Sequence, residues 1–308
     1  MAITLVPGAI ATPNADDDFV LERRGVWKRF RKHKLALVGA FVLLAVTLIA
    51  TFAKFLAPAD PNFIDQANWS GYPLAPGVAG HILGTDENGR DLLSRLMYGA
   101  QISLMIAFFT VFLQLTIGTV IGAFAGYYGG LVDYVLMRIT DVFLSIPLLP
   151  LLLVLTAIVA ASSNKASLGL GVIVVIIGGL SWPGVARLVR ASFLSLREKE
   201  FCEAARAVGN PDLRIIFRHL LPNAIAPIIV QGTLSVATVI IVESTLSFLG
   251  FGIQPPTASW GNMLANAESN MAIAPWVAIF PGLCILVTVL AINYLGDGLR
   301  DAIDPNMK

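Results

Sequence analysis

The residues whose types and spacing most clearly indicate a function lie in one short segment, 200–222, which is basic and amphipathic within an otherwise apolar chain. Its first half has small or apolar residues at the spacing of one helix face: Phe201, Ala204, Ala205 and Val208. Gly209 follows at a point where left-handed backbone would end that helix. A rigid body with one apolar side can enter a groove of a partner, so mechanical contact with another subunit is one interpretation of the pattern.

The second half of the segment predicts another short helix, with Asn210 as its cap, Pro211 as its first residue and Pro222 as its end. Its apolar face comprises Leu213, Ile216, Phe217, Leu220 and Leu221. The whole segment therefore predicts a compact helix–turn–helix. From spacing alone, a basic linker that only touches lipid headgroups is equally well supported.

The composition indicates that membrane-spanning helices position this segment. Of the 308 residues, 56% are hydrophobic and 13% are charged, which is typical of an integral membrane protein. A helix needs about 20 apolar residues to cross a bilayer, because its backbone amides must be bonded within the helix. Six stretches are long enough: 35–57, 101–127, 132–160, 168–190, 224–250 and 274–297. We therefore expect an all-α membrane protein with six transmembrane helices.

Basic residues predict the orientation of these helices. One cluster precedes the first span: Arg23, Arg24, Lys28, Arg29, Arg31, Lys32 and Lys34. Another lies between the fourth and fifth spans: Arg187, Arg190, Arg197, Lys199, Arg206, Arg214 and Arg218. The loops of the opposite side hold only Arg90, Arg95 and Lys165. The positive-inside rule thus predicts that both termini are cytoplasmic.

The spans and this orientation together divide the chain into five parts. These are a cytoplasmic tail and basic flank (1–34), a first helix (35–57), an external loop (58–100), a five-helix core (101–297) with the cytoplasmic loop 191–223, and a cytoplasmic tail (298–308).

Small residues, prolines and charges mark particular spans. A glycine recurs at every fourth position of the second span, at Gly118, Gly122 and Gly126, and we expect this stripe to pack closely within the subunit rather than against a sister subunit. Prolines predict kinks in two spans: Pro147 and Pro150 in the third, and Pro183 in the fourth. Such a kink either serves as a gate or is only passive curvature of the helix.

Three charges fall inside the apolar stretches. Arg138 and Asp141 are three residues apart on one helix face, so we expect them to form an ion pair. Glu243 lies near the outer end of the fifth span. It either lines a path through the membrane or pairs within the bundle.

The sequence gives no sign of a catalytic or metal centre. His33, His81 and His219 lie outside the spans, and neither an H-E-x-x-H pattern nor a G-x-x-x-x-G-K-[ST] phosphate loop occurs. Cys202 and Cys284 lie in the cytoplasmic loop and in a span, so no disulfide is expected. We predict a chain that is not an enzyme and holds no cofactor or metal itself. A transporter or channel acting alone would usually show midplane ionisable residues or inverted repeats. Here the charges within the spans are sparse, and spans 4–6 do not duplicate spans 1–3.

Several strings in the sequence resemble a known family. The coupling loop of ABC importer permeases, an EAA–G–LP pattern, is matched by Glu203, Ala204, Ala205, Gly209, Leu221 and Pro222, with His219 where the pattern usually has Ile. Residues 81–104, 246–263 and 295–305 are similar to strings of the C-type permease subunit of dipeptide, oligopeptide and nickel importers. The resemblance spans residues from about 25 to 305.

This resemblance implies a type I importer permease fold in a bacterial or archaeal plasma (inner) membrane. It implies a heterodimer with a sister permease, two cytosolic subunits that bind ATP and Mg, and an external substrate-binding protein. Peptides are the implied cargo, and similar permeases carry nickel complexes, glutathione and oligosaccharides. The external residues Asp86, Glu87, Arg90 and Asp91 would dock the binding protein or, as we favour, brace their own loop. Trp260 would belong to a docking ledge or lie at headgroup level.

Overall fold

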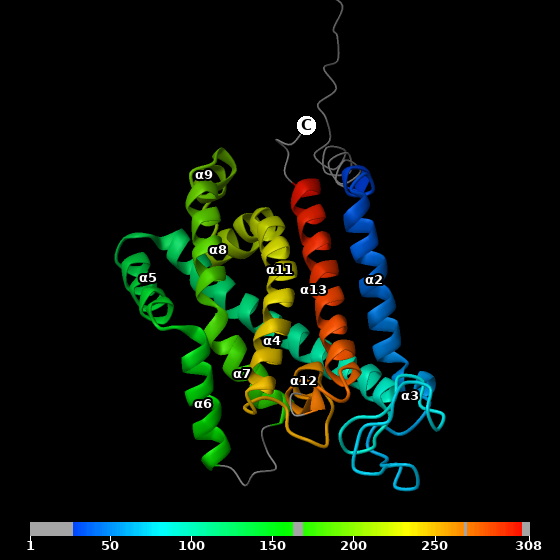
Figure 1. Ribbon diagram of the computed structural model, residues 1–308. Helices are drawn as coiled ribbons and strands as arrows, with labels where there is room; N and C mark the ends of the chain where they lie inside the picture. The colour runs from blue at the N-terminus through cyan, green and yellow to red at the C-terminus, as the bar shows by residue number, and fades with distance from the viewer. Residues whose placement is uncertain (1–26, 163–168, 268–269, 304–308) are drawn as a thin grey trace, which may run out of the picture.

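The computed structural model describes residues 27–162, 169–267 and 270–303, and this part of the chain is helical (Figure 1). Within these ranges the only β-type pairing consists of two isolated bridges, Ile64 with Arg90 and Thr85 with Asp91. Four helical stretches are individually long and apolar enough to cross a membrane: α2 (Lys34–Thr51), α4 (Leu92–Tyr128), the continuous stretch Asp212–Phe248, and α13 (Trp276–Ile303).

Two further crossings are pairs of shorter helices joined at a bend. α5 (Gly130–Ser145) meets α6 (Leu148–Ser162) at 83°, and α7 (Leu170–Ser181) meets α8 (Pro183–Leu196) at 45°. The bends occur where Pro147 and Pro183 fall, because proline has no N–H to donate to the preceding turn. With each pair counted as one span, the prediction of six crossings is confirmed.

Some boundaries differ from the sequence-based expectation. α4 begins at Leu92 rather than at residue 101, because Asp91 caps it by accepting a hydrogen bond from the Ser94 amide at 2.8 Å. α13 continues to Ile303, so residues 298–303 belong to the last span and not to a tail. The predicted tails at residues 1–26 and 304–308 lie outside the described residues.

The helices run up and down between two ends of the bundle (Figure 1). One end, the α9 end, carries the start of α2, the short helix α9 (Glu200–Ala207) and the end of α13. The other end, the α12 end, carries the 57–91 loop with α3 (Ala53–Leu56) and the short helix α12 (Trp260–Ala267). α4 crosses the bundle obliquely and packs against α7, α8 and α11 (Leu221–Phe248), whereas α13 packs against α2 and α11.

The glycine stripe of α4 packs within the subunit, along α8. A Cβ added to Gly118 would lie 2.6 Å from Cβ of Val185, and one added to Gly126 would lie 2.6 Å from Cβ of Phe193. A Cβ on Gly122 would collide with the backbone oxygen of Ala186. The two helix backbones can approach this closely only because the stripe has no side chains.

We therefore expect Gly122→Ala to destabilise the protein by about 1–3 kcal/mol through overpacking. The matched control is Gly179→Ala on α7, where an added Cβ meets nothing within 4 Å. Thermal unfolding of the purified protein in detergent would compare the two variants. Equal unfolding temperatures for both would contradict the close packing of α4 on α8.

Candidate functional site

The first half of the 200–222 segment is the helix α9, which ends in a Schellman motif at Gly209. Gly209 has φ of +81°, its amide donates to the Arg206 oxygen at 2.9 Å, and the Asn210 amide donates to the Ala205 oxygen at 3.2 Å. The predicted left-handed end of this helix is therefore confirmed.

The second half differs from the prediction of a separate helix. The stretch runs from α10 (Asp212–Arg214) through a π-helical turn, η1 (Ile215–Leu220), directly into α11. Pro222 therefore does not end a helix, because the wide π turn in front of it accommodates a residue without an N–H. Asn210 is not the cap either: its side-chain amide turns back and donates to the Ala205 oxygen at 3.1 Å.

The π turn also changes which side chains face inward. Ile215, Ile216 and Leu220 are fully buried, whereas Leu213 and Phe217, which were predicted to share their face, are 55% and 51% exposed. A π turn bonds each residue to the fifth one along, so the spacing of an ordinary helix does not apply here.

The segment is held firmly against the membrane helices. Ile215, Ile216, Cys202 and Ala205 belong to one core cluster with residues of α4 and α8, among them Phe193. Polar contacts add to this packing, since the Tyr127 hydroxyl donates to Asp212 Oδ1 at 2.7 Å and the Arg206 guanidinium lies 5.7 Å from the centre of the Tyr127 ring. The α9–η1 unit therefore packs as one body with α4 and α8, and it continues directly into α11.

The outer side of this unit presents both apolar and charged groups. We define the knob surface as six of its exposed residues: Phe201, Glu203, Ala204, Val208, Leu213 and Phe217. Val208 is 83% exposed, which is unusual for a valine in a packed unit. Of the other predicted coupling residues, Ala205 faces the core, His219 and Leu221 are half-buried, and Pro222 is exposed.

The charges within the spans pair differently from the expectation. Asp141 accepts from the Arg187 guanidinium at 2.6 Å, across to α8, so the predicted Arg138–Asp141 pair is wrong. Arg190 binds Asp133 in the same way. An aspartate can pair with an arginine of its own helix or with one of a neighbouring helix. Here both aspartates of α5 pair with arginines of α8.

Glu243 pairs within the bundle. Its side chain is fully buried on α11, and its Oε1 accepts a hydrogen bond from the Ser247 hydroxyl at 2.7 Å. The same hydroxyl accepts from the Ile253 amide at 3.2 Å. Glu243 therefore fastens the turn after α11 to the helix end.

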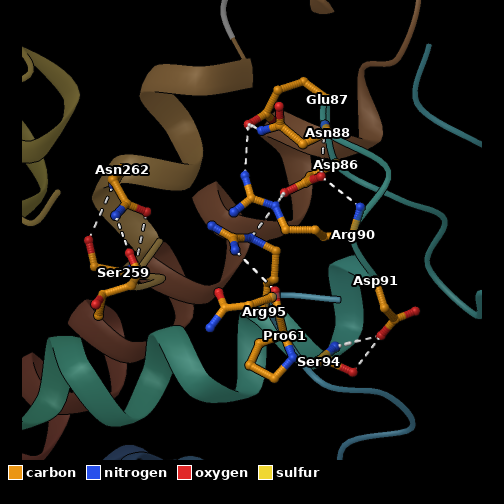
Figure 2. A network of polar contacts seen from close by, with 12 residues as sticks. Pro61, Asp86, Glu87, Asn88, Arg90, Asp91, Ser94, Arg95, Ser259 and Asn262 are labelled. Atoms are coloured by element: carbon orange, nitrogen blue, oxygen red, sulfur yellow. Dashed lines mark hydrogen bonds and ion pairs between the residues drawn. The ribbon is translucent and has the colours of Figure 1, made fainter. Parts of the chain in front are cut away.

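The charged residues of the 57–91 loop form a buried network (Figure 2). Asp86 is 3% exposed, and its Oδ2 lies 3.0 Å from Nε of Arg90 and 3.1 Å from Nε of Arg95 as ion pairs rather than as well-directed hydrogen bonds. Its Oδ1 accepts from the backbone amides of Asn88 and Arg90, both at 2.9 Å. Burial, together with the Asp86 carboxylate, raises the pKa of Glu87.

The predicted external docking residues lie mostly inside the protein. Asp91 is 2% exposed and contacts His81 Nδ1 at 2.8 Å in addition to capping α4. Trp260 is 1% exposed and donates from its indole nitrogen to the Leu96 oxygen at 3.2 Å. The interpretations of Trp260 as a docking ledge or a headgroup anchor are therefore wrong for its side chain, which packs the α12 end together.

A cleft of about 460 Å³ opens where both bent helix pairs break. It is lined by Ile146, Pro147 and Leu148 at the first bend and by Ser181, Pro183 and Gly184 at the second. Its polar lining also includes Gln114 of α4 and three residues of α11: Gln231, Ser235 and Thr238. Neither Glu243 nor Pro150 is among the residues that line it.

Sequence reasoning missed these polar residues. Gln114 and Gln231 each stand alone within an apolar stretch, which was the available signal. Isolated amides in a membrane span are costly and usually face a cavity or another helix. Only the folded structure brings the two glutamines to the same serine.

Comparisons with known proteins agree with this architecture. Residues 118–308 match the family described as binding-protein-dependent transport system inner membrane component, and residues 23–76 match the N-terminal transmembrane domain of oligopeptide transport permease C. The chain is 41% identical to the dipeptide transport system permease protein DppC of Alkalihalophilus pseudofirmus over 96% of this chain and 95% of that protein. It is 42% identical to the glutathione transport system permease protein GsiD of Escherichia coli over 92% of this chain and 90% of that protein.

Among solved structures, the inward-facing MetNI methionine ABC transporter has a chain that shares this fold. The TM-score is 0.56 at 21% identity, over 68% of this chain and 97% of that one. Two family matches that together cover most of the chain, and relatives above 40% identity along nearly its whole length, lead to one conclusion. The chain belongs to the family of inner membrane permease components of binding-protein-dependent ABC importers, in its dipeptide and oligopeptide C-type branch.

Proposed function

We propose that this permease subunit imports short peptides, with the knob surface facing the cytosol as the place where an ATP-binding subunit engages it. The observation that carries the proposal is the covalent path from knob to cleft. α8 leads into α9, and η1 leads into α11. Pro183 and Gly184 of α8 and Gln231 and Ser235 of α11 line the cleft. A push on the knob therefore reaches the cleft through two helices.

The substrate class rests on the relatives. Their names specify dipeptide and glutathione transport, and both cargoes are short molecules whose units are joined by amide bonds.

The remaining partners would be a sister permease that completes the conduit and an external binding protein that delivers the peptide. ATP and Mg would be bound by the ATP-binding subunits, and this chain would carry out no catalysis. The location would be a bacterial inner membrane, with both termini in the cytosol.

Reconstitution would test this proposal. Proteoliposomes that contain the chain with its sister permease, ATP-binding subunits and binding protein are expected to concentrate peptide only when ATP is supplied to the cytosolic side. The chain reconstituted by itself is expected to accumulate nothing against a gradient. Uphill uptake by the isolated chain would overturn the proposal.

Glu203→Ala is expected to weaken the contact between the permease and the ATP-binding subunit by about tenfold, because hydrogen bonds to a charged group contribute about 1.5–3 kcal/mol. Glu203 is exposed, so the variant should insert and fold normally. The matched control is Asp297→Ala, an exposed carboxylate near the C-terminal end of α13, the helix end that lies at the α9 end of the bundle (Figure 1). Pull-down of the ATP-binding subunit and ATP-driven uptake would both report the difference, and equal values for the two variants would exclude a role for Glu203.

A further inference from the structure

We propose that the cleft at the helix breaks is a transit site that recognises an N–H group of the passing solute, through the side-chain oxygen of Gln114. This inference rests on the proposed function, because it assumes that solute passes along this face. It assigns substrate discrimination to the membrane subunit in addition to the binding protein.

The backbone supports a path for solute at this place. Both bends of the described helices, at Pro147 and at Pro183, fall on the wall of the same cleft. Irregular backbone at membrane depth is tolerated where it is buried in protein or lines a water-containing cavity, since hydrocarbon cannot satisfy the freed N–H and C=O groups. Broken helices are also where membrane transporters form their solute sites.

The hydrogen bonds of the cleft leave an acceptor unused. The Gln114 amide nitrogen donates to the Ser235 hydroxyl oxygen at 3.2 Å, and the Gln231 amide nitrogen donates to the same oxygen at 3.4 Å. Gln114 is 6% exposed, and its Oε1 is shielded from solvent and has no hydrogen-bond partner within the described residues. The side chain lines the cleft, and it must turn toward the cleft for a solute to reach this oxygen. An unpaired buried acceptor is costly, and a donor from the solute would remove that cost.

The lining suits weak and reversible contact. Its described residues include amides, hydroxyls and apolar side chains, and none of them is charged. A neutral hydrogen bond contributes only about 0.5–1.5 kcal/mol, so a bound solute can leave again. The volume, about 460 Å³, lies within the range of about 300–1,000 Å³ found for small-molecule sites. A peptide offers matching donors, either backbone N–H groups or its terminal ammonium.

The test compares Gln114→Leu with the wild type in the fully assembled transporter, with trialanine as the probe. Two analogues accompany it: trialanine with N-methylated backbone amides, and propionyl-dialanine, which is trialanine with its terminal amino group replaced by hydrogen. We expect the wild type to prefer trialanine over at least one analogue by a ratio about three- to tenfold larger than that of Gln114→Leu. Because both proteins use the same binding protein, its own preference cancels in this comparison.

The two analogues distinguish the source of the N–H group. A change confined to the methylated analogue identifies the backbone amide, and a change confined to propionyl-dialanine identifies the ammonium group. The matched control is Thr116→Val, two residues further along α4 on its exposed side, which should keep the wild-type ratios. Gln114→Leu with wild-type ratios for both analogues would overturn the inference. Absence of any ATP-driven trialanine uptake by the wild type would instead overturn the proposed peptide import, and the inference with it.

Discussion

Gly209→Val is expected to lower ATP-driven uptake by about tenfold while the protein still inserts into the membrane. The residue has φ of +81°, a conformation that costs a β-branched side chain about 1–3 kcal/mol. An added Cβ meets nothing within 4 Å, so the effect would come from the backbone and not from a collision. Relief of this strain would unwind the end of α9 and displace Val208, so the knob surface would lose its shape.

The control for this prediction is Gly250→Val. Gly250 ends α11 with φ of +83°, its added Cβ also meets nothing within 4 Å, and the amide of Phe251 donates to the Leu246 oxygen as in a Schellman motif. Both variants should therefore lose similar thermal stability, and only Gly209→Val should lose contact with the ATP-binding subunit in a pull-down. Loss of uptake without loss of that contact would contradict the role of the knob surface.

Asp86→Ala is expected to destabilise the protein by about 3–5 kcal/mol, which is the usual cost of removing one partner from a buried ion pair. Arg90 and Arg95, at 7% and 1% exposure, would keep their charges without the carboxylate between them. The substitution also removes the acceptor of two backbone amides in the tight turn at 86–90. We expect the 57–91 loop of the purified protein to become sensitive to added protease and the unfolding temperature to fall.

The comparison for this second prediction is Asp60→Ala in the same loop. Asp60 is exposed and its side chain accepts one hydrogen bond, from the Asn62 amide at 2.7 Å, so loss of this side chain should change the unfolding temperature little. Asp86→Asn keeps an acceptor for the turn but removes the charge, and an intermediate effect is expected. If Asp86→Ala unfolds at the temperature of Asp60→Ala, the network does not brace the loop.

Local features of the fold follow directly from the sequence. The length of each apolar stretch predicts six crossings, because this property belongs to a single segment. Pro147, Pro150 and Pro183 predict interruptions of the third and fourth spans; the bends occur at Pro147 and Pro183, whereas Pro150 lies within α6. The same holds for the end of α9, since a glycine that follows a helical pattern readily takes left-handed backbone.

Ion pairs between different segments cannot be predicted from the sequence in this way. Asp141 was expected to bind Arg138 on its own helix, but α8 brings Arg187 within 2.6 Å. The carboxylate of Asp86 could equally have faced a partner protein, and its burial depends on how the loop folds over the start of α4. Sequence spacing contains no information about which arginine of another helix lies next to a given carboxylate in the folded protein.

The sequence by itself determined the class of the molecule, its crossings and the place of the knob, because hydrophobic length, proline and glycine act within a few residues of their own position. Only the tertiary structure decided that Gln114 and Gln231 meet at Ser235, that both bends open onto one cleft, and that a π turn joins the knob to α11. These features depend on which helix faces meet and on how their backbones fit, and a one-dimensional pattern leaves that open.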